Sequence, residues 1–275
     1  MMEVRRHVVK FAFDGHLFKG YARQPDGGTV EDELIEALVR SDLIAGPKEA
    51  SFASASRVDR GVSAIAAAAA FDTEADTERV LRSLNANTVS LVAHSIATVE
   101  RGFDSRRRAS SRWYRYHFGP GDEERGLDVP SMRRAAGAFE GEHDMSAFAR
   151  LDGREPVRRV LQVSVERRSG ALVMDVRGES FLWNQVRRMA SAIRAVGAGE
   201  LTVEDVERAL AGGGGGPFPP LPPMGLFLMD VTYDGLTFER CDHLPSGTLH
   251  RLREDYHQEQ CSVRFHEYLM NQVRF

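Results

Sequence analysis

The feature that most constrains the fold is an order of apolar patterns that occurs twice along the chain. In each half, segments that alternate apolar and polar residues, as strands do, are separated by segments with helical spacing, in the order β-α-β-β-α-β. We expect strands at about residues 4–13, 51–57, 64–71, 90–99, 113–118, 160–167, 172–178 and 226–233. Helices should follow Thr29 and Thr77, span 130–139 and 184–196, and follow Thr202 as one extra helix.

This order predicts an α+β protein made of two ferredoxin-like, or RRM-like, units. Two such units side by side can merge into one mixed, mostly antiparallel sheet with helices on one side and a central cleft where loops from both halves meet. Residues 1–105 would form the first unit and residues 106–235 the second. Residues 236–275 would be a polar, irregular C-terminal extension with one helix at about 249–260. No identity between the halves is evident, so the repeat is one of architecture.

Arginine dominates the basic residues. Lys10, Lys19 and Lys48 are the only lysines, so 33 of the 36 basic residues are arginine, although the net charge is -4. Guanidinium groups bind phosphate through two hydrogen bonds and stack on bases better than ammonium groups do. The composition therefore permits an RNA-binding face on a mildly acidic protein, although high-GC codon usage would produce the same bias.

Several classes of protein are disfavoured by what the sequence lacks. No apolar run approaches the roughly 20 residues of a membrane span, and residues 1–10 lack the apolar core of a signal peptide. Two cysteines are too few for a disulfide framework, so we expect a cytoplasmic protein. Phosphate-binding glycine loops and the Gly-x-Ser-x-Gly elbow are absent.

A zinc site in the C-terminal extension is also disfavoured. Five residues there could ligate a metal, but their spacing matches no standard zinc pattern. They are Cys241, His243, His257, Cys261 and His266.

One carboxylate stands out at the expected turn between two first-half strands. Within residues 56–64, Asp59 has Arg57 two residues before it and Arg60 directly after it, and Gly61 follows. Nearby positive charges favour the ionised carboxylate, and glycine permits the positive φ of a tight turn. A hairpin loop with a surface salt bridge would give the same pattern, so the functional interpretation depends on the rest of the chain.

Residues 112–116 interleave arginines with aromatic residues on an expected strand. Alternation places Tyr114 and Tyr116 on one face. A tyrosine pair on a strand is more often part of the core. The flanking arginines favour the alternative, in which one ring stacks on an exposed base while the charges hold phosphate.

Two further stretches carry basic groups near turns. Arg187 and Arg188 lie near the start of an expected helix, where a positive charge opposes the helix dipole and so suggests pairing with a carboxylate. Residues 13–24 form a glycine-containing loop whose basic and amide groups could touch phosphate.

Together these stretches resemble the TruA family of tRNA pseudouridine synthases, most closely its archaeal members. The family's catalytic motif, approximately Arg-Thr-Asp-x-Gly-Val-x-Ala, matches residues 57–64 except at Val58. Its Arg-x-Tyr-x-Tyr element, its Phe-x-x-x-x-Val/Ile-Arg helix, its N-terminal aromatic loop and its Gly-Leu-Tyr-Leu element resemble residues 112–116, 181–187, 13–24 and 225–228. The likeness spans about residues 4–235 in the right order, which is more specific than any single motif.

The resemblance implies an enzyme that isomerises uridine to pseudouridine in the tRNA anticodon stem-loop, at tRNA positions 38–40. It also implies a homodimer with an RNA-binding cleft, and no metal or cofactor. A carboxylate is needed because the C1′–N1 glycosidic bond must break before uracil rejoins through C5. By resemblance Asp59 is the nucleophile, and the sequence leaves open whether it attacks C1′ or removes the C2′ proton.

The resemblance assigns the remaining site residues to the substrate. Arg187 would pair with Asp59, and Tyr114 would stack on the flipped uracil and assist in removing the C5 proton. Leu226 would line the apolar side of the pocket, and Arg57 would help to extrude the target nucleotide.

Two alternatives share parts of this pattern. A non-catalytic RNA-binding protein with tandem RRM-like units would have the same fold, but its RNP-type aromatic run is absent. A glycosidase acting on a small nucleoside generally needs two catalytic carboxylates, and no partner for Asp59 stands out.

Overall fold

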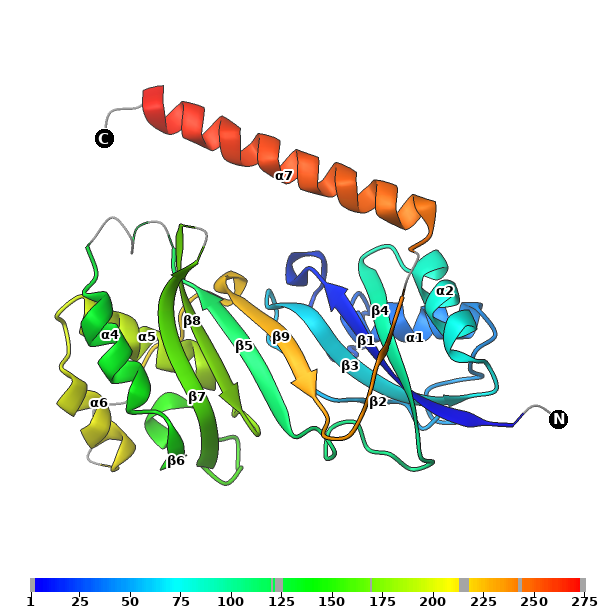
Figure 1. Cartoon of the computed structure of the whole chain (residues 1–275), viewed down its shortest axis with the longest axis horizontal. Coiled ribbons are helices and arrows are strands. Elements are labelled where there is room, and N and C mark those ends of the chain that lie inside the picture. Colours follow the sequence, from blue (N-terminus) through cyan, green and yellow to red (C-terminus); the bar gives the residue numbers. More distant parts are fainter. Residues whose placement is uncertain are drawn as a thin grey trace.

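The computed structural model describes residues 3–119, 121, 126–168, 170–212, 218–241 and 244–272. Within these residues, ten strands form one sheet (Figure 1). The strands are β1 (Arg5–Phe13), β2 (Ala53–Ser54), β3 (Ser63–Thr73), β4 (Leu91–Val99), β5 (Ser111–His117), β6 (Gly141–Asp144), β7 (Val157–Arg168), β8 (Ala171–Gly178), β9 (Leu226–Thr232) and β10 (Glu239–Arg240). The helices are α1 (Val30–Arg40), α2 (Thr77–Asn87), α4 (Val129–Gly137), α5 (Gln185–Gly197), α6 (Val203–Leu210) and α7 (Ser246–Gln272).

The sheet is mixed and mostly antiparallel, as expected. Its strand order is β10-β4-β1-β3-β9-β5-β8-β7-β6, and β2 pairs with β3 off this path. The β3–β9 pairing is parallel, whereas every other pairing described is antiparallel. This parallel pair joins the strands of the first half to those of the second.

The alanine-rich segment in β3 shows how context overrides propensity. Residues 66–70 are all alanine, which favours helix in isolation. All five are buried, and this part of β3 pairs with β1 on one edge and, at Ala69 and Ala70, with β2 on the other. Small side chains suit a central strand that has close neighbours on both sides, and the expected strand is confirmed.

Two of the three N-cap residues predicted from the sequence are confirmed. Thr29 and Thr202 each form a capping box. The threonine hydroxyl accepts a hydrogen bond from the backbone N–H of the third helical residue, and the aspartate at that position accepts one from the threonine N–H. Helix α2, however, is capped by Asp76, whose side chain accepts the Arg79 N–H. Thr77 is therefore the first helical residue, and its prediction as the cap was wrong by one position.

Four elements differ from the expectation. The strand expected at 51–57 is reduced to β2, because residues 46–51 close a turn in which Ala50 N–H donates to Gly46 O and Ser51 has a φ of +46°. Strand β6 was not expected. The extension is not irregular, since β10 pairs with β4 and α7 is longer at both ends than predicted.

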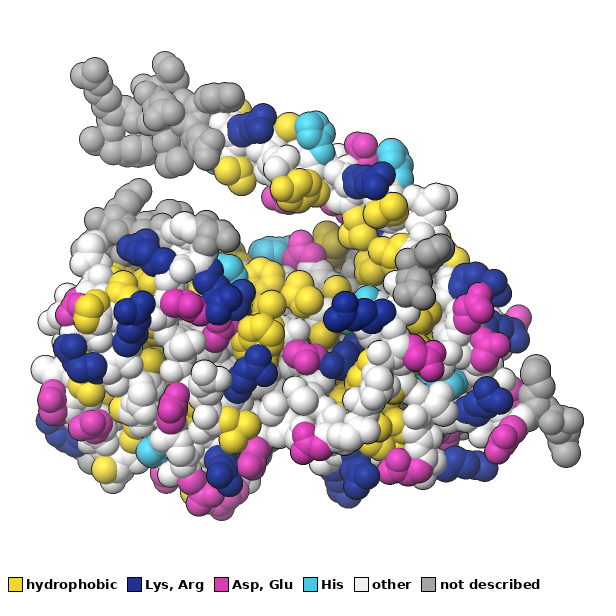
Figure 2. Space-filling model, viewed as in Figure 1, with side chains coloured by type: hydrophobic (Ala, Val, Ile, Leu, Met, Phe, Trp, Pro, Cys, Tyr) yellow, Lys and Arg dark blue, Asp and Glu magenta, His cyan; other side chains and the backbone are white. Residues whose placement is uncertain are grey.

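Helix α7 runs along the upper side of the molecule in Figure 1, from α2 toward the second half. Its first turns are attached to α2, where the Thr248 hydroxyl donates to Asn85 O at 3.0 Å. Figure 2 shows apolar side chains exposed along its length. They include Tyr256, Val263 and Phe265, which are 66%, 56% and 61% exposed.

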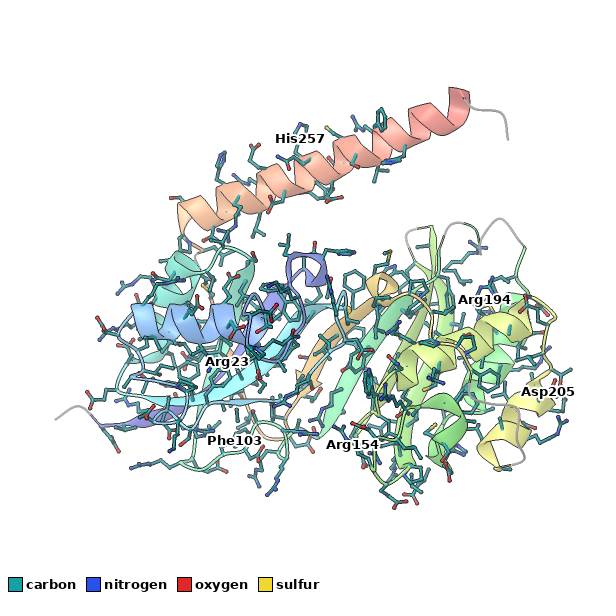
Figure 3. All side chains as sticks on the ribbon, turned by 180° about the vertical axis from the view of Figure 1, so that it is seen from behind. Arg23, Phe103, Arg154, Arg194, Asp205 and His257 are labelled. Carbon is teal, nitrogen blue, oxygen red and sulfur yellow. The ribbon has the colours of Figure 1, made fainter. Side chains whose placement is uncertain are left out.

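The helices flanking the junction leave a space between them. Figures 1 and 3 show α1 and α5 on the same side of the sheet, one over each half.

The buried apolar residues form one continuous cluster that includes both halves. One candidate metal ligand, His243, lies outside the described residues.

Candidate active site

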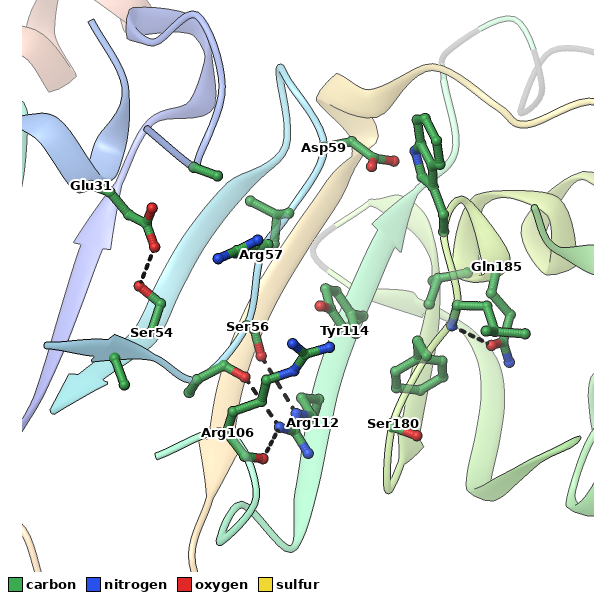
Figure 4. Close-up of a pocket in the computed structure, with 18 of the residues that line it drawn as sticks. Glu31, Ser54, Ser56, Arg57, Asp59, Arg106, Arg112, Tyr114, Ser180 and Gln185 are labelled. Carbon is green, nitrogen blue, oxygen red and sulfur yellow. Dashed lines mark hydrogen bonds between the residues drawn. The ribbon is translucent and has the colours of Figure 1, made fainter. Parts of the chain in front are cut away.

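A cavity of about 880 Å³ opens between α1 and α5 and is lined by residues of both halves (Figure 4). Cavities of roughly 300–1,000 Å³ are typical of ligand sites. Its walls come from α1, the segment between β2 and β3, β5, the segment 180–184, the start of α5 and the first residue of β9. The expected cleft at the junction is therefore present.

A tight turn presents Asp59 at this cavity. Val62 N–H donates to Asp59 O at 3.1 Å, and Gly61 has a φ of +83°. A positive φ at the third residue is what a type II turn requires, and glycine adopts it without strain. A Cβ on Gly61 would also lie 3.2 Å from Pro223 Cγ. The glycine thus lets the turn pack closely against the segment that leads into β9.

Arg187, from the first turn of α5, contacts the Asp59 carboxylate. Its Nη1 lies 3.0 Å from Asp59 Oδ2, and the two side chains are 13% and 26% exposed. The same Nη1 donates to Asn184 Oδ1 at 3.0 Å, and Nε donates to Leu221 O at 2.6 Å. The guanidinium is fixed by three acceptors, so it holds the carboxylate in one orientation.

The arginines adjacent to Asp59 in sequence do not pair with it. Among the described residues, Asp59 forms an ion pair with Arg187 and with neither Arg57 nor Arg60. Arg60 occupies the second position of the turn and is exposed. Arg57 lies before the turn, is also exposed, and lines the cavity. The nearby arginines that the local sequence offered form no ion pair with Asp59, and the observed partner is Arg187, the residue that the family resemblance named, 128 residues away.

Tyr114 and Leu226 also line the cavity. Tyr114 is 8% exposed, and the ring of Phe181 meets it edge-on with 5.4 Å between centroids. Burial raises the pKa of the Tyr114 hydroxyl to about 12, so the phenol stays protonated at neutral pH. Leu226 is 6% exposed and supplies apolar surface at the start of β9.

Arg112, one of the arginines that the sequence suggested could hold phosphate, instead connects backbone segments around the site. Its side chain is buried and donates to four backbone carbonyls, those of Ala55, Arg106, Ala109 and Glu179. These bonds join the segment before the Asp59 turn to the segment before α5. Desolvation lowers the pKa of the Arg112 guanidinium from its ordinary value. Alternation along β5 already places Arg112 on the Tyr114 face, and that was the available signal.

The cavity has more basic than acidic groups on its walls. Six arginines and four carboxylates line it, and two of the carboxylates are satisfied locally. Glu31 accepts hydrogen bonds from the Ser54 hydroxyl and the Arg23 N–H, and Asp104 accepts from the N–H groups of Arg106 and Arg107. The balance favours an anionic ligand such as a nucleic acid strand.

Neither a metal site nor a membrane-spanning helix is found among the residues that the structure describes. No group of three or more His, Cys, Asp or Glu side chains there is arranged to hold a metal ion. None of the described helices is both long enough and apolar enough to cross a membrane.

The matching family model and the similar proteins all carry the description tRNA pseudouridine synthase. A family model described as tRNA pseudouridine synthase matches residues 135–234, a segment that contains Arg187 but not Asp59. The tRNA pseudouridine synthase A of Thermococcus kodakarensis is 42% identical over 235 residues, which cover 84% of this chain and 86% of that protein. The corresponding protein of Pyrococcus abyssi is 35% identical over 256 residues, covering 92% and 94%.

Solved structures give a more distant likeness. A crystal structure of the archaeal box H/ACA sRNP Nop10-Cbf5 complex matches with a TM-score of 0.31 and 13% identity. The match covers 69% of this chain and 43% of that chain. It is too distant to bear on the site.

Proposed function

The chain belongs to the tRNA pseudouridine synthase A family, whose enzymes isomerise uridine in tRNA, and from that membership we propose that its target lies in the anticodon stem-loop, at tRNA positions 38–40. Asp59 is the catalytic carboxylate. The observation that carries this assignment is the 3.0 Å contact between Arg187 and Asp59, which both line a cavity of about 880 Å³.

The Asp59 carboxylate can break the glycosidic bond of uridine by either of two routes. If Asp59 attacks C1′, the new C1′–O bond forms as C1′–N1 breaks, and the electron pair leaves on N1 of uracil. If Asp59 removes the C2′ proton, the same bond breaks as the sugar becomes a glycal. Both routes put Asp59 against the ribose, and in both the freed uracil turns so that C5 faces C1′. In the first route C5 attacks C1′ as the C1′–O bond to Asp59 breaks, and in the second C5 bonds to C1′ of the glycal as Asp59 returns the proton to C2′. In both, N1 gains a proton and C5 loses its proton to solvent.

The other residues act on the substrate. Arg187 keeps Asp59 oriented, because its own position is fixed by Asn184 and Leu221. Tyr114 stacks on the flipped uracil, and its protonated hydroxyl makes it a hydrogen-bond donor or acceptor rather than a ready base. Leu226 covers the apolar edge of the base. Arg57 has no side-chain partner among the described residues and is available to the phosphate of the extruded nucleotide.

The architecture suits this substrate. We interpret residues 1–105 and 106–235 as two merged ferredoxin-like units, because the strand orders β4-β1-β3-β2 and β9-β5-β8-β7 both fit that unit, with residues 236–275 as an extension. The RNA would bind in the cleft at their junction. A homodimer working in the cytoplasm follows from the family resemblance.

The test is a paired assay on unmodified tRNA. Release of tritium from C5-labelled uridine measures turnover, and chemical mapping at nucleotide resolution locates the product. Asp59→Asn should abolish turnover while the stem-loop still binds. Asp152→Asn is the matched control, because Asp152 lines the same cavity and asparagine tolerates its φ of +51°. Equal turnover in wild type and Asp59→Asn would remove the assignment, and product outside the stem-loop would refute the proposed target.

A further inference from the structure

Trp183 is an exposed aromatic residue on the wall of the active-site cavity. Its side chain is 41% exposed, whereas Leu182 before it is 4% exposed and Phe181 packs against Tyr114. An indole contributes a large apolar surface, and leaving it open to solvent forgoes burial of that surface. The arrangement therefore suggests a partner that covers Trp183 when the cavity is occupied.

One face of the indole is already covered by a cation. The guanidinium carbon of Arg150 lies 4.2 Å from the ring centroid, and Arg150 N–H donates to Trp183 O at 2.9 Å. The two residues form an isolated antiparallel bridge, so the backbone fixes this stacked pair. Trp183 is among the residues that line the cavity, so it is positioned to contact a molecule bound there.

The indole is also rigidly connected to the catalytic ion pair. The next residue, Asn184, has a left-handed conformation with a φ of +62°, which asparagine tolerates better than most residues. Asn184 Oδ1 accepts from Arg187 Nη1, the same atom that contacts Asp59. Leu182 N–H donates to Gln185 Oε1 at 2.8 Å, which fixes the other side of Trp183.

We propose that Trp183, backed by Arg150, is the stacking platform for a nucleobase next to the target uridine in the RNA strand. Stacking on an aromatic ring is how proteins hold unpaired bases, and a cation behind the ring adds to the attraction. The neighbouring base is the better occupant because Tyr114, at 8% exposure, lies deeper than Trp183. A nucleic acid suits the site better than a peptide, since Arg57 and Arg154 line the same cavity.

Tryptophan fluorescence tests the proposal directly, because Trp113 and Trp183 are the only two tryptophans in the chain. A Trp113→Phe variant reports Trp183 alone, and a Trp183→Phe variant reports Trp113 alone. Trp113 is a matched control: Arg177 lies 4.4 Å from its ring centroid, but Trp113 does not line the cavity. In an Asp59→Asn background, the stem-loop should quench Trp183 emission and leave Trp113 emission nearly unchanged.

Kinetics provide the second readout. Trp183→Ala should raise KM for the stem-loop about tenfold, in line with the loss of one stacked base, and change the single-turnover rate by less than about twofold. Trp183→Phe should restore KM to within about threefold of wild type. A purely structural role would instead lower the single-turnover rate and thermal stability together.

The proposal rests on the proposed function, and the outcomes separate the two. Conversion of the stem-loop with no quenching of Trp183 and an unchanged KM in Trp183→Ala would overturn the stacking role alone. A change in sedimentation of Trp183→Ala with an unchanged KM would assign Trp183 to a protein contact and also overturn it. Failure of the wild type to convert the stem-loop would remove the proposed target before Trp183 is considered.

Discussion

Replacing Arg187 by methionine should slow the chemical step about 30-fold. Arg187 donates to Asp59, Asn184 and Leu221, and methionine removes all three bonds while filling much of the same space. A hydrogen bond to a charged group contributes about 1.5–3 kcal/mol. The side chains of Arg187 and Asp59 are 13% and 26% exposed, so water partly replaces the lost donor and we discount the value to about 2 kcal/mol. At 1.36 kcal/mol per factor of ten, this gives about 30-fold.

The measurement is the single-turnover rate of tritium release with enzyme in excess over tRNA, which isolates chemistry from product release. Arg187→Lys should lie between wild type and Arg187→Met, because an ammonium keeps the charge but cannot reproduce the planar arrangement of donors. Arg188→Met is the matched control. Arg188 Nη1 donates to Phe218 O and the residue lies one position along α5, so its loss should affect stability without slowing chemistry.

Two results would refute this reasoning. If Arg187→Met retains the wild-type single-turnover rate and only raises KM, Arg187 binds RNA and does not orient Asp59. If Arg188→Met slows the step as much as Arg187→Met does, the effect comes from general disturbance of α5 rather than from the ion pair.

Two further predictions concern the buried groups around the site. The raised pKa of Tyr114, about 12, keeps its phenol protonated below pH 10. The ratio of the wild-type to the Tyr114→Phe single-turnover rate should therefore be constant from pH 6 to 10. A ratio that rises tenfold per pH unit would mean that the phenolate acts as the base. Arg112→Met should lower the free energy of unfolding by about 3 kcal/mol, because four backbone carbonyls lose their donor and two of those hydrogen bonds are buried. Thermal denaturation should show this as a Tm about 6–12 °C lower, whereas Arg154→Met, at an exposed residue of the cavity wall, should shift Tm by about 2 °C or less.

The order of elements could be predicted because long segments carry clear periodicity. Helix α1 has a complete capping box at Thr29 and an apolar stripe, and both signals are local. Strands β6 and β10 were missed because they have four and two residues, too few for alternation to be visible. They exist because the edges of β7 and β4 offer backbone groups to pair with, which is tertiary information.

The residues of the site fall into the same two groups, those indicated by local sequence and those that depend on tertiary structure. Asp59 stood out because a carboxylate before a glycine and beside arginines is a local pattern. The position of Arg187 at a helix start suggested a carboxylate partner, but only resemblance to a known family named Asp59 as that partner. Local physics favoured Arg57 and Arg60 as partners instead. The exposure of Trp183 could not be predicted, since its neighbour Leu182 is equally apolar and is buried. Which of two adjacent apolar residues faces a cavity depends on the backbone between β8 and α5.

The geometry of the site depends on the parallel junction between the halves. Ala64 of β3 pairs with Leu228 of β9, and Leu228 pairs in turn with Tyr114 of β5, so three strands fix Tyr114 relative to the Asp59 turn just before β3. Adjacent strands lie about 4.8 Å apart, which places Ala64 and Tyr114 about 10 Å apart across the sheet. The β3–β9 ladder has two registered pairs, yet it joins the half that holds Asp59 to the half that holds Arg187. The first half alone would keep Asp59 but lose Arg187 and Tyr114, so the mechanism that we propose requires both halves of the sheet.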